Sequence, residues 1–220
     1  MEIFEKIKND SNIIKIYNEI ENPKDNEKFW TYHGWSHINN VVEMVEKILI
    51  QLGYNEEYIE NAKIAALLHD LGMIKCKDNH DIRSYNMAKK YFEKNNIELK
   101  YKDEILDAIK SHRNAYNSDN VMAIVLIFAD KIDIKKTRLT TKGYEIIGLR
   151  QYQFINDINV FKEKDNLTVK FTIDNRCNKQ ELEEYYFTPK VFKAIRSFAS
   201  YFKYNLKILW NDEEWKYKYL

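Results

Sequence analysis

Five consecutive apolar residues, Ile64 to Leu68, run directly into the pair His69-Asp70. A helix without a polar side is buried all round, so this run predicts a helix in the middle of a core. Burying an imidazole and a carboxylate at the end of that helix costs several kcal/mol unless both groups find partners. A cation satisfies both at once. If this pair binds a metal ion, other residues of the chain must supply the remaining ligands.

The composition excludes several classes of protein. The 35 Lys and Arg residues against 34 Asp and Glu residues leave a formal charge of +1, which does not indicate general nucleic-acid binding. The two cysteines, Cys76 and Cys177, show no zinc or disulfide spacing. The N-terminus lacks the apolar core of a signal peptide, and the longest apolar run, 121–129, is far shorter than the ~18 residues that cross a bilayer. We therefore expect a cytoplasmic protein that does not enter a membrane.

Apolar side chains at helical spacing indicate a mostly helical chain, and the scarcity of Gly and Pro agrees with this. Ser36 and Asn55 are suited to be N-caps of two of the helices. The run 121–129 also suits a buried strand, but Ser118 as a cap favours a helix. The predicted helices are 2–21, 36–52, 55–68, 81–94, 102–112 and 121–129.

The C-terminal part differs in kind. Residues 158–173 alternate in polarity around Lys164-Asp165-Asn166, which predicts a β-hairpin, and an apolar stripe predicts a long final helix over about 189–210. We expect an all-α fold in one domain over 1–220, with a core of about 30–140 and an extension over 141–220 that carries the hairpin and the last helix. The stripe of that helix packs either on the domain or on a second subunit, so a homodimer stays open.

Four further polar residues stand on inward-facing stripes or at helix ends. His37 and His112 continue apolar stripes, Asp130 ends the second apolar run, and His80 starts a predicted helix. Each alone has an ordinary explanation, such as a hydrogen-bonded core histidine or, for Asp130, an ion pair with Lys131. Together they favour a mixed nitrogen and oxygen site for Fe, Mn, Zn, Ni or Mg.

The order His37, His69-Asp70, Asp130 resembles the HD-domain superfamily of metal-dependent phosphohydrolases, which is named for the doublet. The segments 32–38, 65–72 and 128–133 are similar to its motifs, and the resemblance covers about residues 30–140. It implies an HD-domain helical bundle and one or two divalent metal ions (Fe, Mn, Zn, Ni, Co or Mg). By the resemblance, the first metal is held by His37, His69, Asp70 and Asp130. Asp70 bridges to a second metal, which His80 and His112 help to bind.

The resemblance also implies a reaction, hydrolysis of a phosphate mono- or diester by metal-activated water. Tyr32-His33-Gly34 resembles a segment of cyclic-nucleotide phosphodiesterases whose histidine protonates the leaving oxygen. His33 is therefore a candidate general acid, and packing near the site explains it equally well. Asp70 is a second candidate catalytic residue. The third is Lys131, which the family pattern places beside the metal aspartate.

The expected substrate is a nucleotide or another small phosphorylated metabolite. Lys75, Arg83 and Arg113 stand near ligand positions in the sequence and are candidate phosphate contacts, although each is also explained as a solvated surface charge. Two other functions stay open. Relatives of this fold include di-iron enzymes that activate oxygen, and the site also suits a non-catalytic module that binds a nucleotide.

Overall fold

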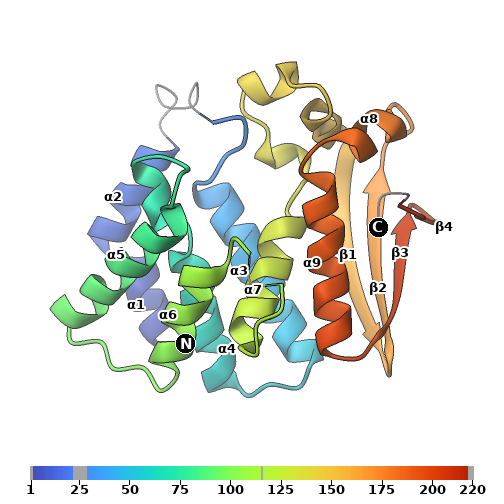
Figure 1. Ribbon diagram of the computed structural model, residues 1–220. Helices are drawn as coiled ribbons and strands as arrows, with labels where there is room; N and C mark the ends of the chain where they lie inside the picture. The colour runs from blue at the N-terminus through green and yellow to red at the C-terminus, as the bar shows by residue number, and fades with distance from the viewer. Residues whose placement is uncertain (1, 22–28, 115, 218–220) are drawn as a thin grey trace. The chain divides into compact units, whose positions relative to one another are not determined.

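The computed structural model describes residues 2–21, 29–114 and 116–217 (Figure 1). They form two compact units, the first made of the described residues of 1–22 and 33–129 and the second of those of 23–32 and 130–220. The division falls inside helix α7 (Val121–Ile132), between Ala129 and Asp130. The expectation of one domain over 1–220 stays a prediction.

The first unit is helical (Figure 1). Its elements are α1 (Glu2–Lys8), α2 (Ser11–Ile20), α3 (Trp35–Gln51), α4 (Glu56–Leu68), the short 3-10 helix η1 (Leu71–Ile74), α5 (His80–Lys94), α6 (Lys102–Ser111) and most of α7. The run 121–129 is therefore helical, as predicted, but its cap is Asn120 rather than Ser118, because the Asn120 side chain accepts from the N–H of Met122 at 2.9 Å. None of the described helices is both long and apolar enough to cross a membrane.

Helix α4 forms the middle of this unit, as its sequence predicts. Residues Ile64 to Leu68 are completely buried. The helix begins at the predicted cap, where the side chain of Asn55 accepts a hydrogen bond from the backbone N–H of Tyr58 at 2.9 Å. Glu56 and Glu57 in the first turn interact favourably with the helix dipole. The cap fixes the start of the helix, and the buried run continues to Leu68, which His69 follows.

The helix expected over 2–21 is in fact two helices. Helix α1 ends at Lys8, and Asp10 takes an extended conformation. The Asp10 carboxylate accepts hydrogen bonds from the N–H groups of Asn12 and Ile13 at 2.8 and 3.4 Å, which makes it the N-cap of α2. Apolar residues continue at helical spacing on both sides of the break, so the sequence pattern does not reveal it.

Helix α3 begins one residue earlier than its predicted cap. Its N-cap is Gly34, and Ser36 lies inside the first turn, where its backbone N–H donates to the carboxylate of Glu21 at 3.3 Å. A Cβ atom at Gly34 would lie 2.1 Å from the Glu21 side chain, so a larger residue here would have to displace Glu21. His33 stands before the helix, as the sequence predicts.

The second unit contains a sheet with strand order β1-β2-β3-β4 (Figure 1). The predicted hairpin is present as β1 (Ile155–Glu163) and β2 (Asn166–Ile173), which pair antiparallel. The other elements are the 3-10 helices η2 (Lys136–Arg138), η3 (Lys142–Glu145) and η4 (Leu149–Phe154), helices α8 (Lys179–Glu184) and α9 (Thr188–Tyr201), and strands β3 (Asn205–Trp210) and β4 (Glu213–Glu214).

The long final helix expected over 189–210 is wrong in its second half. Helix α9 ends at Tyr201, Lys203 takes a left-handed conformation with φ 57°, and the chain turns back as β3. Strand β3 runs parallel to β2, with Leu206 opposite Leu167. Leu206 and Leu209, which continue the apolar stripe in sequence, therefore belong to a sheet. The all-α class holds for the first unit, and the second is a mixed helix and sheet structure.

The core of the second unit lies between α9 and the sheet. The ring of Trp215 lies 5.2 Å from that of Phe171 on β2 and 5.0 Å from that of Phe192 on α9. Its indole N–H donates to the buried carboxylate of Glu183 at 2.7 Å. Edge-to-face aromatic packing of this kind adds to the hydrophobic gain from burial. The late sheet is therefore well anchored to its helix.

The buried run of α4 makes a prediction about stability. We expect Leu67→Ala, at a fully buried position, to lower the free energy of unfolding by about 2–5 kcal/mol, because the substitution leaves a cavity. Ile50→Ala is the matched control, since Ile50 is 61% exposed on α3 and should change the free energy by less than about 0.5 kcal/mol. Urea unfolding followed by circular dichroism measures both. Equal effects of the two substitutions would contradict the central position of α4.

Candidate metal centre

The predicted doublet stands where the buried helix α4 ends. His69 is the residue that follows its last turn, and Asp70 comes next, ahead of η1. Both side chains are buried, with exposed fractions of 0% and 2%. The hydroxyl of the buried Tyr17, on α2, donates a hydrogen bond to the carbonyl oxygen of Leu67, one of the last carbonyls of α4. Tyr17 thus supports the end of α4, a role that its place in an apolar stripe does not reveal.

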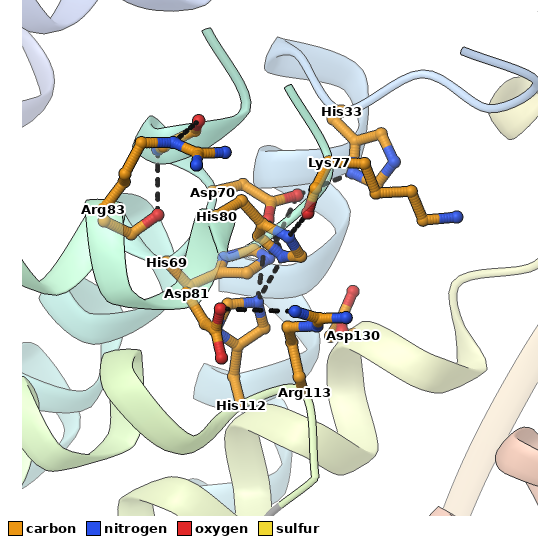
Figure 2. A network of polar contacts seen from close by, with 12 residues as sticks. His33, His69, Asp70, Lys77, His80, Asp81, Arg83, His112, Arg113 and Asp130 are labelled. Atoms are coloured by element: carbon orange, nitrogen blue, oxygen red, sulfur yellow. Dashed lines mark hydrogen bonds and ion pairs between the residues drawn. The ribbon is translucent and has the colours of Figure 1, made fainter. Parts of the chain in front are cut away.

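Asp70 is the centre of the cluster, and its Oδ2 atom faces three histidines (Figure 2). The Nδ1 atom of His33 lies 2.7 Å from this oxygen. The Nε2 atoms of His69 and His37 lie 3.5 and 3.6 Å from it. His37 comes from the first turn of α3, so this side of the site joins the start of one helix to the end of another.

The other oxygen of Asp70 faces two more histidines. The Nε2 atoms of His80 and His112 lie 3.3 and 3.7 Å from Oδ1. His80 is the first residue of α5, and His112 directly follows α6. The chain has five histidines in all, and every one of them contacts this single carboxylate.

Backbone carbonyls orient three of the rings in the same way. The Nδ1 atoms of His69, His80 and His112 each lie 2.7 Å from the carbonyl oxygen three residues earlier in the chain. A carbonyl oxygen only accepts, so each Nδ1 carries a proton and donates it. In the neutral ring the Nε2 atom is then the one that can bind a cation, and all three Nε2 atoms point toward Asp70.

His80 and His112 are in direct contact with each other, and their Nε2 atoms lie only 2.9 Å apart. Both Nδ1 atoms already donate to carbonyls, so two neutral rings would bring two lone pairs together. Either one ring is protonated or a cation lies against both. This pair of nitrogens, with the carboxylate beside it, has the donor chemistry of a divalent metal site.

Two groups of ligand atoms in the first unit lie within 4.8 Å of one another: His33, His37 and Asp70; and His69, Asp70 and His112. With His80, five of the six residues that the sequence predicts as metal ligands are thus brought together, and His33 is an additional member. The sixth, Asp130, belongs to the second unit, and its role as a ligand stays a prediction. The described residues fit one or two metal ions by their donor set.

The protonation state of Asp70 reflects its neighbours. Burial raises the pKa of the carboxyl, but the attraction of His69 and His33 and the hydrogen bond from His33 outweigh burial and hold the pKa well below its usual range. Asp70 is therefore a carboxylate, the form that binds metal. Burial, followed by the negative charge of Asp70, raises the pKa of Tyr17 well above its usual value, so Tyr17 stays a hydrogen-bond donor.

The cationic residues predicted to contact substrate have varied surroundings. The guanidinium of Arg83 donates to the carbonyl oxygens of Gly72 and Cys76 (Figure 2). Arg113 lies 3.5 Å from the carboxylate of Asp81, and Lys75 is exposed. The ammonium of Lys131, which is largely buried, binds the carboxylate of Asp130. The roles of these four residues stay predictions.

The first unit thus has five histidines around one buried aspartate, a donor set that fits a divalent metal ion. Residues 34–135 match the family model of the HD domain, a range that contains every predicted metal ligand and begins directly after His33. This part of the chain therefore belongs to the HD-domain superfamily, as its motifs predict.

Comparison with solved structures gives a weaker likeness. The crystal structure of a predicted HD superfamily hydrolase from an uncultured Thermotogales bacterium matches with a TM-score of 0.46 and 20% sequence identity. The match covers 66% of this chain and 88% of that one. A comparison with curated proteins finds no match.

The geometry predicts that metal binding is coupled to proton release. We expect Mn²⁺ added to the metal-free protein to raise the melting temperature, because a ligand of the folded state stabilises it by about 2.7 kcal/mol at a hundred times its Kd. The affinity should fall as the pH drops from 7.5 to 5.5, since protonated imidazoles cannot bind a metal. Calorimetry in buffers of different ionisation enthalpy measures both the affinity and the protons released.

A ligand variant and a matched control sharpen this test. His69→Gln should weaken binding by at least ten-fold, because it removes one nitrogen ligand. Asp103→Asn, in the first turn of α6, should leave the affinity unchanged because Asp103 belongs to none of the candidate ligand groups. Metal binding that is independent of pH, or equal in the two variants, would argue against the cluster as the binding site.

Proposed function

We propose that this chain hydrolyses a phosphate mono- or diester, of a nucleotide or another small phosphorylated metabolite, with the help of one or two divalent metal ions. The observation that carries the proposal is the contact of 2.9 Å between the Nε2 atoms of His80 and His112 beside the Asp70 carboxylate. A second metal position explains why two rings with donating Nδ1 atoms meet there. Membership of the HD superfamily supports the same chemistry.

The ligands divide into two sets around Asp70. His37, His69 and Asp130 would hold the first metal together with Asp70, and the opposite Asp70 oxygen would hold the second with His80 and His112. When bound, such ions polarise a phosphate ester and activate water for attack. The carbonyls behind the rings keep the Nε2 atoms aimed inward, so the chain itself preorganises the site.

The cationic side chains near the candidate ligands are suited to bind an anionic substrate. Lys131 lies beside Asp130, and the Arg113 side chain is 37% exposed while contacting Asp81. A partly exposed guanidinium can bind phosphate oxygens with its planar fork while Asp81 holds it in place. We propose Arg113 and Lys75 as phosphate contacts and Lys131 as a catalytic residue that stabilises charge next to the first metal position.

His33 fits the role of a general acid. Its Nδ1 atom lies 2.7 Å from Asp70, and its side chain is 12% exposed, more than the other histidines of the cluster. Both backbone polar groups of the preceding residue, Tyr32, bind Arg138. The N–H of Tyr32 donates to the carbonyl of Arg138 at 2.8 Å, and its carbonyl accepts from the Arg138 guanidinium. A fixed, partly accessible imidazole is suited to protonate a leaving oxygen.

The proposed reaction is tested with a panel of nucleotides and sugar phosphates in the presence of Mn²⁺, Fe²⁺, Co²⁺, Ni²⁺, Zn²⁺ or Mg²⁺. We expect at least one ester to release phosphate or a phosphomonoester. Asp70→Asn should lower kcat by about a thousand-fold or more, because it removes the carboxylate shared by both metal positions. Asp103→Asn serves again as the control with unchanged turnover.

Two outcomes would redirect the proposal. Oxygen consumption with an organic substrate in the iron-loaded protein would support a di-iron oxygenase instead. Nucleotide binding without turnover, in protein that holds its metal, would support a binding module. Either result, together with no hydrolysis across the panel, would refute the phosphohydrolase.

A leaving-group comparison tests His33. His33→Gln should lower kcat for an alkyl phosphate ester by about 10²–10⁴-fold, because the alkoxide needs a proton, and should affect a p-nitrophenyl ester much less. The alkaline limb of the pH profile should also disappear. Metal content is the control, because His33 belongs to one candidate ligand group with His37 and Asp70. Loss of metal in His33→Gln, with equal effects on both esters, would make His33 a ligand rather than an acid.

A further inference from the structure

The loop that joins the doublet to His80 carries candidate metal ligands at both of its ends. Asp70 precedes η1, the chain continues through residues 75–79, and His80 begins α5. Residues 75–79 are exposed, yet His80 itself is 7% exposed and must meet both His112 and Asp70. The path of this loop therefore decides where the imidazole of His80 lies.

Arg83, on the first turn of α5, ties the loop down from outside the cluster (Figure 2). Its Nε donates to the carbonyl of Gly72 at 3.1 Å, and its Nη2 donates to the carbonyl of Cys76. One planar guanidinium thus binds two carbonyls that lie four residues apart. The neighbouring Ser84 adds a third contact, because its buried Oγ accepts from the N–H of Gly72 at 2.8 Å.

Gly72 permits this close arrangement. A Cβ atom at Gly72 would lie 2.2 Å from the carbonyl oxygen of His80 and 2.8 Å from the Arg83 side chain. The loop backbone therefore lies directly against the first turn of α5, and both the N–H and the carbonyl of Gly72 are bound by residues of that turn. Glycine is required here because the helix backbone occupies the space of a side chain.

The end of the loop next to α5 connects the Arg83 contacts to the imidazole of His80. Cys76, whose carbonyl Arg83 binds, directly precedes Lys77, whose carbonyl accepts from His80 Nδ1 at 2.7 Å. Asn79 then turns the chain in a left-handed conformation with φ 52°, a geometry that a non-glycine residue adopts at some cost. The position of the Lys77 carbonyl sets both the orientation and the tautomer of His80.

We propose that Arg83 is a positioning residue for His80 and thereby sets the affinity of the second metal position, rather than a contact to the substrate. The guanidinium fixes the Cys76-Lys77 backbone, that backbone fixes Nδ1 of His80, and Nε2 is left aimed at Asp70 and His112. This inference rests on the proposed two-metal function. Of the candidate ligands of the first metal, only Asp70 adjoins the loop, and none lies within residues 75–79 or on α5. The first position should therefore not depend on Arg83.

The test is a metal titration of the full chain with Mn²⁺, followed by calorimetry and by electron paramagnetic resonance, in which a coupled pair of ions differs from a single ion. In Arg83→Gln we expect the second Kd to rise about 10–100-fold, the range for residues that orient ligands, and the first Kd to stay within three-fold. Arg83→Lys should leave the second Kd nearly as high, because the ammonium of lysine is a point donor and cannot bind two carbonyls as the planar guanidinium does. Lys89→Ala, exposed on the same helix, is the control with both Kd values unchanged.

Each other outcome overturns the inference. Two unchanged Kd values in Arg83→Gln would refute it, and a raised KM with unchanged metal binding would make Arg83 a substrate contact. Parallel loss of both metals in folded Arg83→Gln and Arg83→Lys would make the role a general structural one. If Arg83→Gln does not fold, Arg83→Lys decides by the same criteria. A wild-type chain that binds no second metal is a distinct result, because it refutes the two-metal form of the proposed function itself.

Discussion

A single buried carboxylate organises this structure. Asp70 contacts all five histidines of the chain through its two oxygens. A buried anion is stable only when positive charge or hydrogen-bond donors surround it, and here the attraction of the imidazoles outweighs the cost of burial. A cation bound by the neutral rings would stabilise the same buried carboxylate.

Helix ends bring the cluster together. His37 lies in the first turn of α3, His69 follows α4, His80 begins α5 and His112 follows α6. Helix ends leave backbone carbonyls without partners in the helix, and His69 and His112 use such carbonyls to fix their Nδ1 protons, while His80 uses the carbonyl of Lys77 in the preceding loop. Backbone carbonyls that the helix leaves unpaired thus hold the imidazole rings with their Nε2 atoms toward Asp70. The fold and the site are therefore built from the same interactions.

The first unit could largely be predicted from sequence, whereas in the second only the β1-β2 hairpin and the first part of α9 could. Ile64 to Leu68 have no polar side and can only be buried, and Asn55 marks where their helix begins. By contrast, Leu206 and Leu209 continue the spacing of α9, and a local pattern cannot show that the chain turns back at Lys203. Strand β3 forms because β2 offers it a parallel partner, with Leu167 opposite Leu206 although 39 residues separate them. A contact over that distance leaves no periodic trace in the sequence.

The sequence by itself predicted most of the residues that the structure brings around Asp70, because an imidazole or carboxylate on an inward-facing stripe or at the end of a buried helix needs a partner. It also determined the superfamily, through the order of its motifs. Only the tertiary structure decided how the members face one another: which oxygen of Asp70 each histidine meets, and that His80 and His112 lie 2.9 Å apart. It also showed Arg83 bound to loop carbonyls, because the path of a loop depends on contacts across space that spacing in the chain does not encode.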